Sequence, residues 1–142
     1  MESNTPDPQP EQQSSGIRKL AAIMFTDIVG FSKKMGSNEF TTLDLLETHN
    51  KLISEVVTKH KGNIIKSIGD AFFVEFQSTV NAVQSAIECQ KVLFEHNKSA
   101  APDKKIQIRI GVHVGDVVFK GGDIFGDGVN IAARIQPLAE PG

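Results

Sequence analysis

The stretch Leu20-Ala-Ala-Ile-Met-Phe-Thr-Asp-Ile-Val-Gly-Phe-Ser32 is an apolar run that contains a single carboxylate, Asp27. A run this short and this apolar predicts a β-strand that is buried on both faces. An ionised aspartate in such a strand is costly unless it is paired or bound to a metal. Gly30 then lets the chain turn, which would aim backbone N–H groups of Val29, Gly30, Phe31 and Ser32 at one point beside the carboxylate. This suits a metal with phosphate bound to it, although an Asp that only caps the turn fits the same residues.

The composition is that of one globular domain, with 142 residues of which 39% are hydrophobic and 23% are charged. The net charge of -2 and the absence of Trp and Tyr make nucleic acid a poor candidate partner, because nucleic-acid binding uses basic surfaces and stacking aromatic residues. No apolar stretch reaches the roughly 20 residues that cross a membrane. The single cysteine, Cys89, excludes an internal disulfide, so we expect a cytoplasmic protein.

Residues 1–16 hold three of the six prolines, together with Gln, Ser and Glu, and have almost nothing to bury. This composition predicts a flexible leader, which either links the domain to an upstream sensor or regulatory domain or is a free end. The remaining residues, 17–142, are expected to form the folded domain.

Apolar residues at three- and four-residue spacing predict two helices, from a cap at 37–39 to about 61, and from 80 to about 97. Between them, the strand-like runs 63–68 and 71–76 are separated only by Gly69-Asp70, which predicts a tight β-hairpin. Strict alternation predicts a strand over 106–115, with Arg109 and His113 on its polar face. A glycine-rich loop over 121–128 and a last helix over 129–138 follow.

The order strand, helix, hairpin, helix, strand predicts an α+β fold, with an antiparallel sheet and its helices on one face in the ferredoxin-like (split βαβ) arrangement. In this arrangement the first strand is central and neighbours the hairpin, so Asp27 and Asp70 can come close. Two carboxylates without Cys or His ligands favour Mg²⁺ or Mn²⁺, held as two ions on the phosphates of a nucleotide. Against this, Asp70 can be present only because Gly-Asp makes a good turn.

Three blocks of the sequence resemble the signature motifs of the class III nucleotidyl cyclases, the adenylate and guanylate cyclase catalytic domains. They are Phe25-Thr-Asp-Ile-Val-Gly-Phe-Ser32, Lys66-Ser-Ile-Gly-Asp70 and Asp123-Ile-Phe-Gly-Asp-Gly-Val-Asn-Ile-Ala-Ala-Arg134. The blocks fall in the family's order, and the similarity extends from about Arg18 to the end of the chain. The resemblance implies an adenylate cyclase that converts ATP into 3′,5′-cyclic AMP and pyrophosphate.

The resemblance also implies a metal site. Asp27 and Asp70 match the family's two metal-binding aspartates, and the Ile28 carbonyl matches an auxiliary ligand. The ions, Mg²⁺ or Mn²⁺, would activate the ribose 3′-hydroxyl and neutralise the triphosphate.

Four further residues match positions that contact the substrate in this family. Lys66 and Asp123 match the pair that selects the purine; one donor and one acceptor suit adenine, whereas guanine presents the reverse pattern. Asn130 and Arg134, at i and i+4, match the transition-state residues that orient the ribose and stabilise charge on the α-phosphate. In the family these two residues reach the metals of the other subunit, which implies a homodimer and an inactive monomer.

The sequence ends at residues 137–142, where the family's domain continues through further strands and a helix, so we expect a domain that lacks its C-terminal part. This keeps open a non-catalytic nucleotide-binding or dimerisation module of the same fold. A diguanylate cyclase is a weaker alternative, because Gly121-Gly-Asp-Ile-Phe125 resembles that family's hairpin motif but lacks the acidic residue that follows it. A ferredoxin-like RNA-binding domain is disfavoured by the acidic pI of about 6.1.

Overall fold

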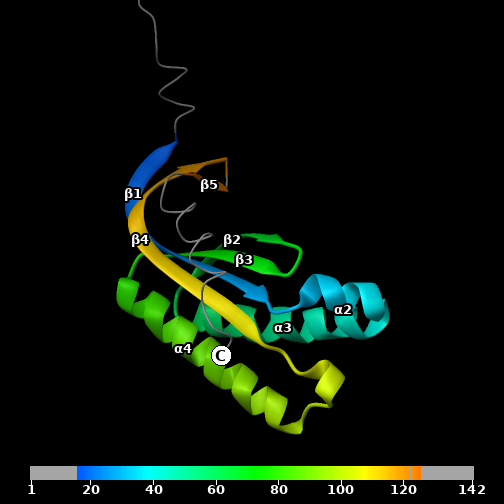
Figure 1. Ribbon diagram of the computed structural model, residues 1–142. Coiled ribbons are helices and arrows are strands. Elements are labelled where there is room, and N and C mark those ends of the chain that lie inside the picture. Colours follow the sequence, from blue (N-terminus) through cyan, green and yellow to red (C-terminus); the bar gives the residue numbers. More distant parts are fainter. Residues whose placement is uncertain (1–15, 122, 126–142) are drawn as a thin grey trace, which may run out of the picture.

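The computed structural model describes residues 16–121 and 123–125. The elements in chain order are β1 (Ile17–Ile28), α2 (Phe31–Ser37), α3 (Glu39–Lys59), β2 (Asn63–Ile68), β3 (Ala71–Phe76), α4 (Thr79–Ser99), a 3₁₀ turn η1 (Pro102–Lys104), β4 (Ile108–Lys120) and β5 (Asp123–Phe125). The strands form one antiparallel sheet in the order β2-β3-β1-β4-β5 (Figure 1). The first four strands in this order have the predicted ferredoxin-like topology, so the predicted fold class is confirmed.

Strand β1 is the centre of the sheet, as its apolar sequence predicts. It pairs with β3 on one side and with β4 along its whole length on the other. Four consecutive residues, Ala21 to Met24, are at most 2% exposed. Because neighbouring residues of a strand point to opposite faces, the side chains of this part of β1 are buried on both faces of the sheet.

The two faces of the sheet have different neighbours. Helices α3 and α4 lie side by side and pack against one face (Figure 1), where the main core forms around Met24, Val74 and Phe76. The opposite face, called the open face below, carries a second cluster. Its buried members are Ala21, Ile23, Phe73 and Val117, with Phe25, Ile65 and Phe119 packed against them. Burial of both clusters stabilises the sheet by about 25 cal/mol for each Å² of apolar surface removed from water.

The two long helices begin at side-chain caps. Asn38 Oδ1 accepts a hydrogen bond from the Thr41 N–H, and Ser78 Oγ accepts one from the Asn81 N–H. Such caps satisfy N–H groups that have no partner within the helix. Both helices lie where the apolar spacing predicts them, and among the described helices none is long and apolar enough to cross a membrane.

The structure differs from the sequence prediction in two places. Helix α2 is not predicted, because none of its seven residues is buried and it therefore has no apolar periodicity to recognise. The strand predicted to end at residue 115 continues to Lys120, and β5 follows inside the predicted glycine-rich loop. The predicted last helix, 129–138, lies outside the described residues.

One polar side chain, His49, occupies a core position of α3. It is fully buried, its ring packs against Phe72 with 5.5 Å between ring centroids, and Nδ1 is 2.9 Å from Asn50 Oδ1. Burial lowers the pKa of His49, and the Asn50 hydrogen bond and the charge of Asp70 oppose this shift only in part. The imidazole is therefore held neutral in the folded chain.

A neutral buried histidine makes stability depend on pH. As the pH falls through 6.5, the ordinary pKa of histidine, the unfolded chain protonates His49 before the folded chain does, so the free energy of unfolding should fall. Urea denaturation at several pH values measures this slope. The His49→Gln variant should show a flatter dependence, and an unchanged slope in that variant would contradict the assignment.

The only cysteine of the sequence, Cys89, is also fully buried in α4. Burial raises the pKa of its thiol to about 12, and the thiolate is the reactive form. We expect a thiol reagent such as DTNB to leave the folded chain unlabelled and to label it completely in denaturant. Labelling at the same rate in both conditions would contradict the packing of α4 against the sheet.

Candidate active site

The β2–β3 hairpin brings Asp70 to the end of β1. The hairpin turns at Gly69, whose φ of 59° is a left-handed conformation that glycine adopts without strain. The ladder between β1 and β3 ends at the pair Thr26 and Phe72. Continued by two residues, the same register would place Ile28 opposite Asp70. There the backbone N–H of Ile28 donates a hydrogen bond of 2.7 Å to Asp70 Oδ2. The carboxylate therefore takes the place of a backbone acceptor in the ladder.

Asp27 immediately precedes Ile28, so both predicted metal-binding aspartates lie at the same end of the sheet. Asp27 is half-buried, and alternation along β1 puts it on the open face with Ile23 and Phe25. On β4, Arg109 is its direct cross-strand neighbour. The sequence predicts only that Arg109 lies on the polar face of its strand, because a cross-strand pair depends on the sheet register.

Lys66 also reaches the open face. Its Nζ lies 5.1 Å from the centroid of the Phe73 ring, and the Phe73 ring meets the Phe25 ring at 4.5 Å and 81°, an edge-on contact. Lys66 from β2, Phe73 from β3 and Asp27 from β1 thus lie on one face of three adjacent strands.

The turn after β1 agrees with the prediction only in part. Gly30 has φ of 72° and precedes α2, as its role in a turn predicts. The N–H of Val29, however, donates to the carbonyl of Gln107 at 2.8 Å. This N–H is therefore part of the sheet, and the expectation that N–H groups starting at residue 29 point beside the carboxylate is wrong for Val29. Phe31 packs its side chain against the main core, and Ser32 follows it at the exposed start of α2.

Three of the predicted residues have no described side chain. The backbone of Asp123 begins β5 and pairs with Lys120, at the far end of β4 from the pair formed by Asp27 and Arg109. Asn130 and Arg134 lie outside the described residues. Their roles remain those implied by the sequence motif.

The donors at the end of β1 have the chemistry that a hard divalent cation requires. Within the part of the chain that the structure describes, no three or more His, Cys, Asp or Glu side chains come together as a metal site. The two carboxylates at this end of the sheet offer only oxygen, which Mg²⁺ and Mn²⁺ prefer, and Mg²⁺ usually completes its shell with water and substrate phosphates. Asp27 and Asp70 therefore fit ions that are bound jointly with a nucleotide.

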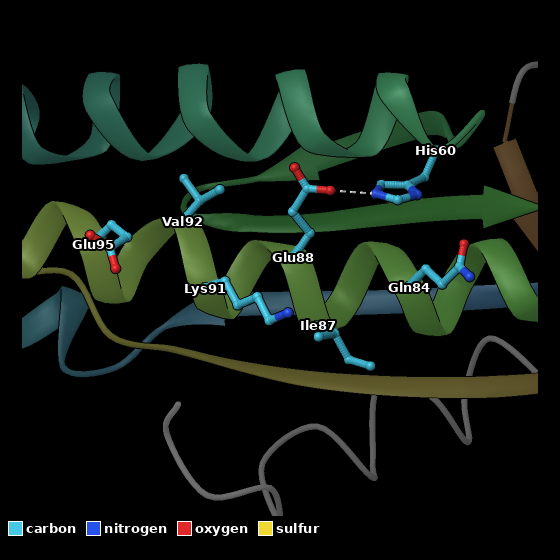
Figure 2. A pocket seen from close by; sticks show the side chains of 7 residues that line it. All are labelled: His60, Gln84, Ile87, Glu88, Lys91, Val92 and Glu95. Carbon is cyan, nitrogen blue, oxygen red and sulfur yellow. Dashed lines mark hydrogen bonds and ion pairs between the residues drawn. The ribbon is translucent and has the colours of Figure 1, made fainter.

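A hollow of about 630 Å³ lies elsewhere, on the helical layer (Figure 2). It is lined by His60, Gln84, Ile87, Glu88, Lys91, Val92 and Glu95. His60 Nε2 is 2.7 Å from Glu88 Oε1, and this hydrogen bond, together with one from Lys59, lowers the pKa of Glu88. None of the residues predicted from the motifs lines this hollow, so it is separate from the candidate site.

Comparison with known proteins identifies the class to which this fold and this site belong. A model of the adenylate and guanylate cyclase catalytic domain matches residues 15–142. The chain therefore belongs to this family of nucleotidyl cyclases.

Individual relatives agree with this assignment. The putative adenylate cyclase 3 of Rhizobium meliloti is 44% identical over 126 residues, which cover 88% of this chain and 22% of that protein. The chain thus spans about a fifth of the length of that curated relative. The adenylate/guanylate cyclase/hydrolase from Silicibacter pomeroyi has a TM-score of 0.81 at 35% identity, over 88% of this chain and 73% of that one. The adenylyl cyclase CyaB from P. aeruginosa has a TM-score of 0.74 at 26% identity, over 88% and 74%.

The bond between Asp70 and Ile28 leads to a stability prediction. Ile28 is 3% exposed, so Asp70→Ala leaves its N–H without an acceptor and should lower the free energy of unfolding by about 1–3 kcal/mol. Asp70→Asn keeps a side-chain oxygen in reach and should cost less. Urea denaturation measures both, and Asp103→Ala, at an exposed carboxylate of η1, should change stability by less than about 0.5 kcal/mol. Equal losses in Asp70→Ala and Asp103→Ala would contradict the structural role of Asp70.

Proposed function

We propose that this chain is an adenylate cyclase domain that converts ATP into 3′,5′-cyclic AMP and pyrophosphate. The observation that carries the proposal is the 2.7 Å hydrogen bond from the Ile28 N–H to Asp70, which holds this carboxylate at the end of the strand that bears Asp27. In a chain of the cyclase family, two carboxylates at this point suit chemistry on a nucleotide triphosphate.

Asp27 and Asp70 would hold two Mg²⁺ or Mn²⁺ ions, with the Ile28 carbonyl as a further ligand. When bound, the ions would favour ionisation of the ribose 3′-hydroxyl and offset the charge of the triphosphate. Arg109 is the cross-strand neighbour of Asp27 on β4, so its guanidinium would place positive charge beside the triphosphate. Arg binds phosphate oxygens well. The backbone of Gly30, Phe31 and Ser32 would bind the substrate at the turn beside these groups.

The reaction is a displacement at the α-phosphorus. The ribose 3′-oxygen forms a bond with this phosphorus and gives up its proton, and the bond from the phosphorus to the oxygen that bridges to the β-phosphate breaks. Pyrophosphate leaves with that electron pair. Asn130 would orient the ribose, and Arg134 would stabilise the charge that develops on the transferring phosphate.

Adenine is the proposed base because of Lys66 and Asp123. Adenine presents an acceptor at N1 and a donor at its N6 amine, which match a lysine and an aspartate. Guanine would leave both groups unpaired, which is costly in a closed site. The relative at 44% identity, a putative adenylate cyclase, supports ATP over GTP, and a guanylate cyclase is the alternative.

We further propose that the active unit is a twofold homodimer in the cytoplasm, in which Asn130 and Arg134 of one copy complete the metal site of the other. An upstream sensor or regulatory domain is the expected source of control.

The test is product formation from ATP and, separately, from GTP, in the presence of Mn²⁺ over a range of protein concentrations. We expect cyclic AMP from ATP, with a specific activity that rises with protein concentration because two chains form each site. Asp27→Asn and Asp70→Asn should each reduce kcat by about 10²-fold or more, since each weakens binding of the metals that the reaction requires. Arg134→Lys should also lower kcat, because lysine cannot contact two phosphate oxygens at once.

The alternatives give different results in the same assay. Cyclic GMP as the main product would indicate a guanylate cyclase. ATP binding without any cyclic product, at every protein concentration in the presence of Mn²⁺, would overturn the proposal and indicate a non-catalytic module of the same fold.

A further inference from the structure

The position of Lys66 on the open face depends on an irregularity in β2. Ile64 is paired with Val74, but the next pair of the ladder is Lys66 with Phe73, so one residue, Ile65, is inserted on the β2 side. This is a β-bulge, in which two residues of one strand oppose one residue of its partner. Bulges occur frequently beside active sites, where they redirect a side chain.

The bulge changes the face on which Lys66 lies. Ile64 packs against the main core on the helical face, and Ile65 packs against the cluster on the open face. Strict alternation would return Lys66 to the helical face with Ile64. Because of the inserted residue, Lys66 instead lies opposite Phe73, whose ring belongs to the open face.

Phe73 is well placed to fix the ammonium group in this position. The ring is 7% exposed, and Phe25, its cross-strand partner in β1, meets it edge-on at 4.5 Å. Lys66 Nζ lies 5.1 Å from the centroid of the same ring, within the range of a cation–π interaction. The chain of contacts from Phe25 through Phe73 to Lys66 links the ammonium to the strand that carries Asp27.

We propose that Phe73 is a positioning residue for Lys66, and that its ring together with the bulge at Ile65 determines nucleotide selectivity by fixing where the ammonium meets the purine. The inference rests on the proposed function, because it assigns Phe73 a part in base selection. Phe73 touches no reacting atom; it acts through Lys66.

The first measurement needs no turnover. In the NMR spectrum of the nucleotide-free chain, the ring current of Phe73 should shift the Lys66 Cε protons upfield of their ordinary position. Lys19 and Lys98, which lie over the rings of Phe119 and Phe94, should be shifted in the same way and should stay shifted when Phe73 is replaced. Phe73→Leu should remove the Lys66 shift, and Phe73→Tyr, which keeps a ring, should retain it. The inference is overturned if the Lys66 Cε protons of the unaltered chain have their ordinary chemical shift, or if Phe73→Leu leaves their chemical shift unchanged. This outcome does not depend on whether the chain is a cyclase.

The second measurement is the ratio of kcat/KM for ATP to that for GTP. Phe73→Leu should lower this ratio about fivefold, within the range that a cation–π contact supports, and Phe73→Tyr should restore it. Phe76→Leu is the matched control, because Phe76 lies on the same strand but is fully buried in the main core. It should lower stability and leave the ratio unchanged.

The two measurements separate the possible failures. No cyclic product from the unaltered chain contradicts the proposed function, while the Lys66 proton shifts still decide the placement by Phe73. A ratio that is equal in Phe73→Leu and in the unaltered chain, with lower stability, assigns Phe73 to the core alone and overturns its role in selectivity.

Discussion

The hydrogen bond between the Ile28 N–H and the Asp70 carboxylate is the contact on which the candidate site depends. Without it, the hairpin tip and the end of β1 would be joined only by the ladder that stops at Thr26 and Phe72. The bond satisfies a buried backbone donor and at the same time holds the Asp70 carboxylate at the end of the strand that carries Asp27.

The two faces of the sheet have different roles. Helices α3 and α4 cover one face, and their apolar residues form the main core together with those of the strands. The open face carries the aromatic pair Phe25 and Phe73 with charged side chains beside it. A site built on strands in this way holds its side chains more firmly than a loop would, because strand backbones are fixed by hydrogen bonds on both sides.

The match to the family model assigns the chain to the cyclases, whereas the choice of nucleotide depends on single side chains. The family includes adenylate and guanylate cyclases on one scaffold, so the sheet itself does not select a base. Selection requires a donor and an acceptor at defined places, and small shifts of either group change which base is paired. The register of β2 at Lys66 is therefore as important to the proposed specificity as the identity of the residue.

The sequence by itself determined the element order, the central position of β1, the hairpin at Gly69-Asp70 and the two long helices, because apolar periodicity and turn residues are local signals. It also supplied the candidate residues, through motifs that resemble those of the cyclases. Helix α2 escaped prediction because none of its residues is fully buried and its sequence shows no apolar periodicity. Only the tertiary structure decided that Asp70 bonds to Ile28, that Arg109 faces Asp27 and that a bulge turns Lys66 to the open face. The first two depend on the pairing of β1 with segments far from it in sequence, and the third on one residue inserted within the β2–β3 hairpin; the apolar pattern of a single strand does not specify these registers.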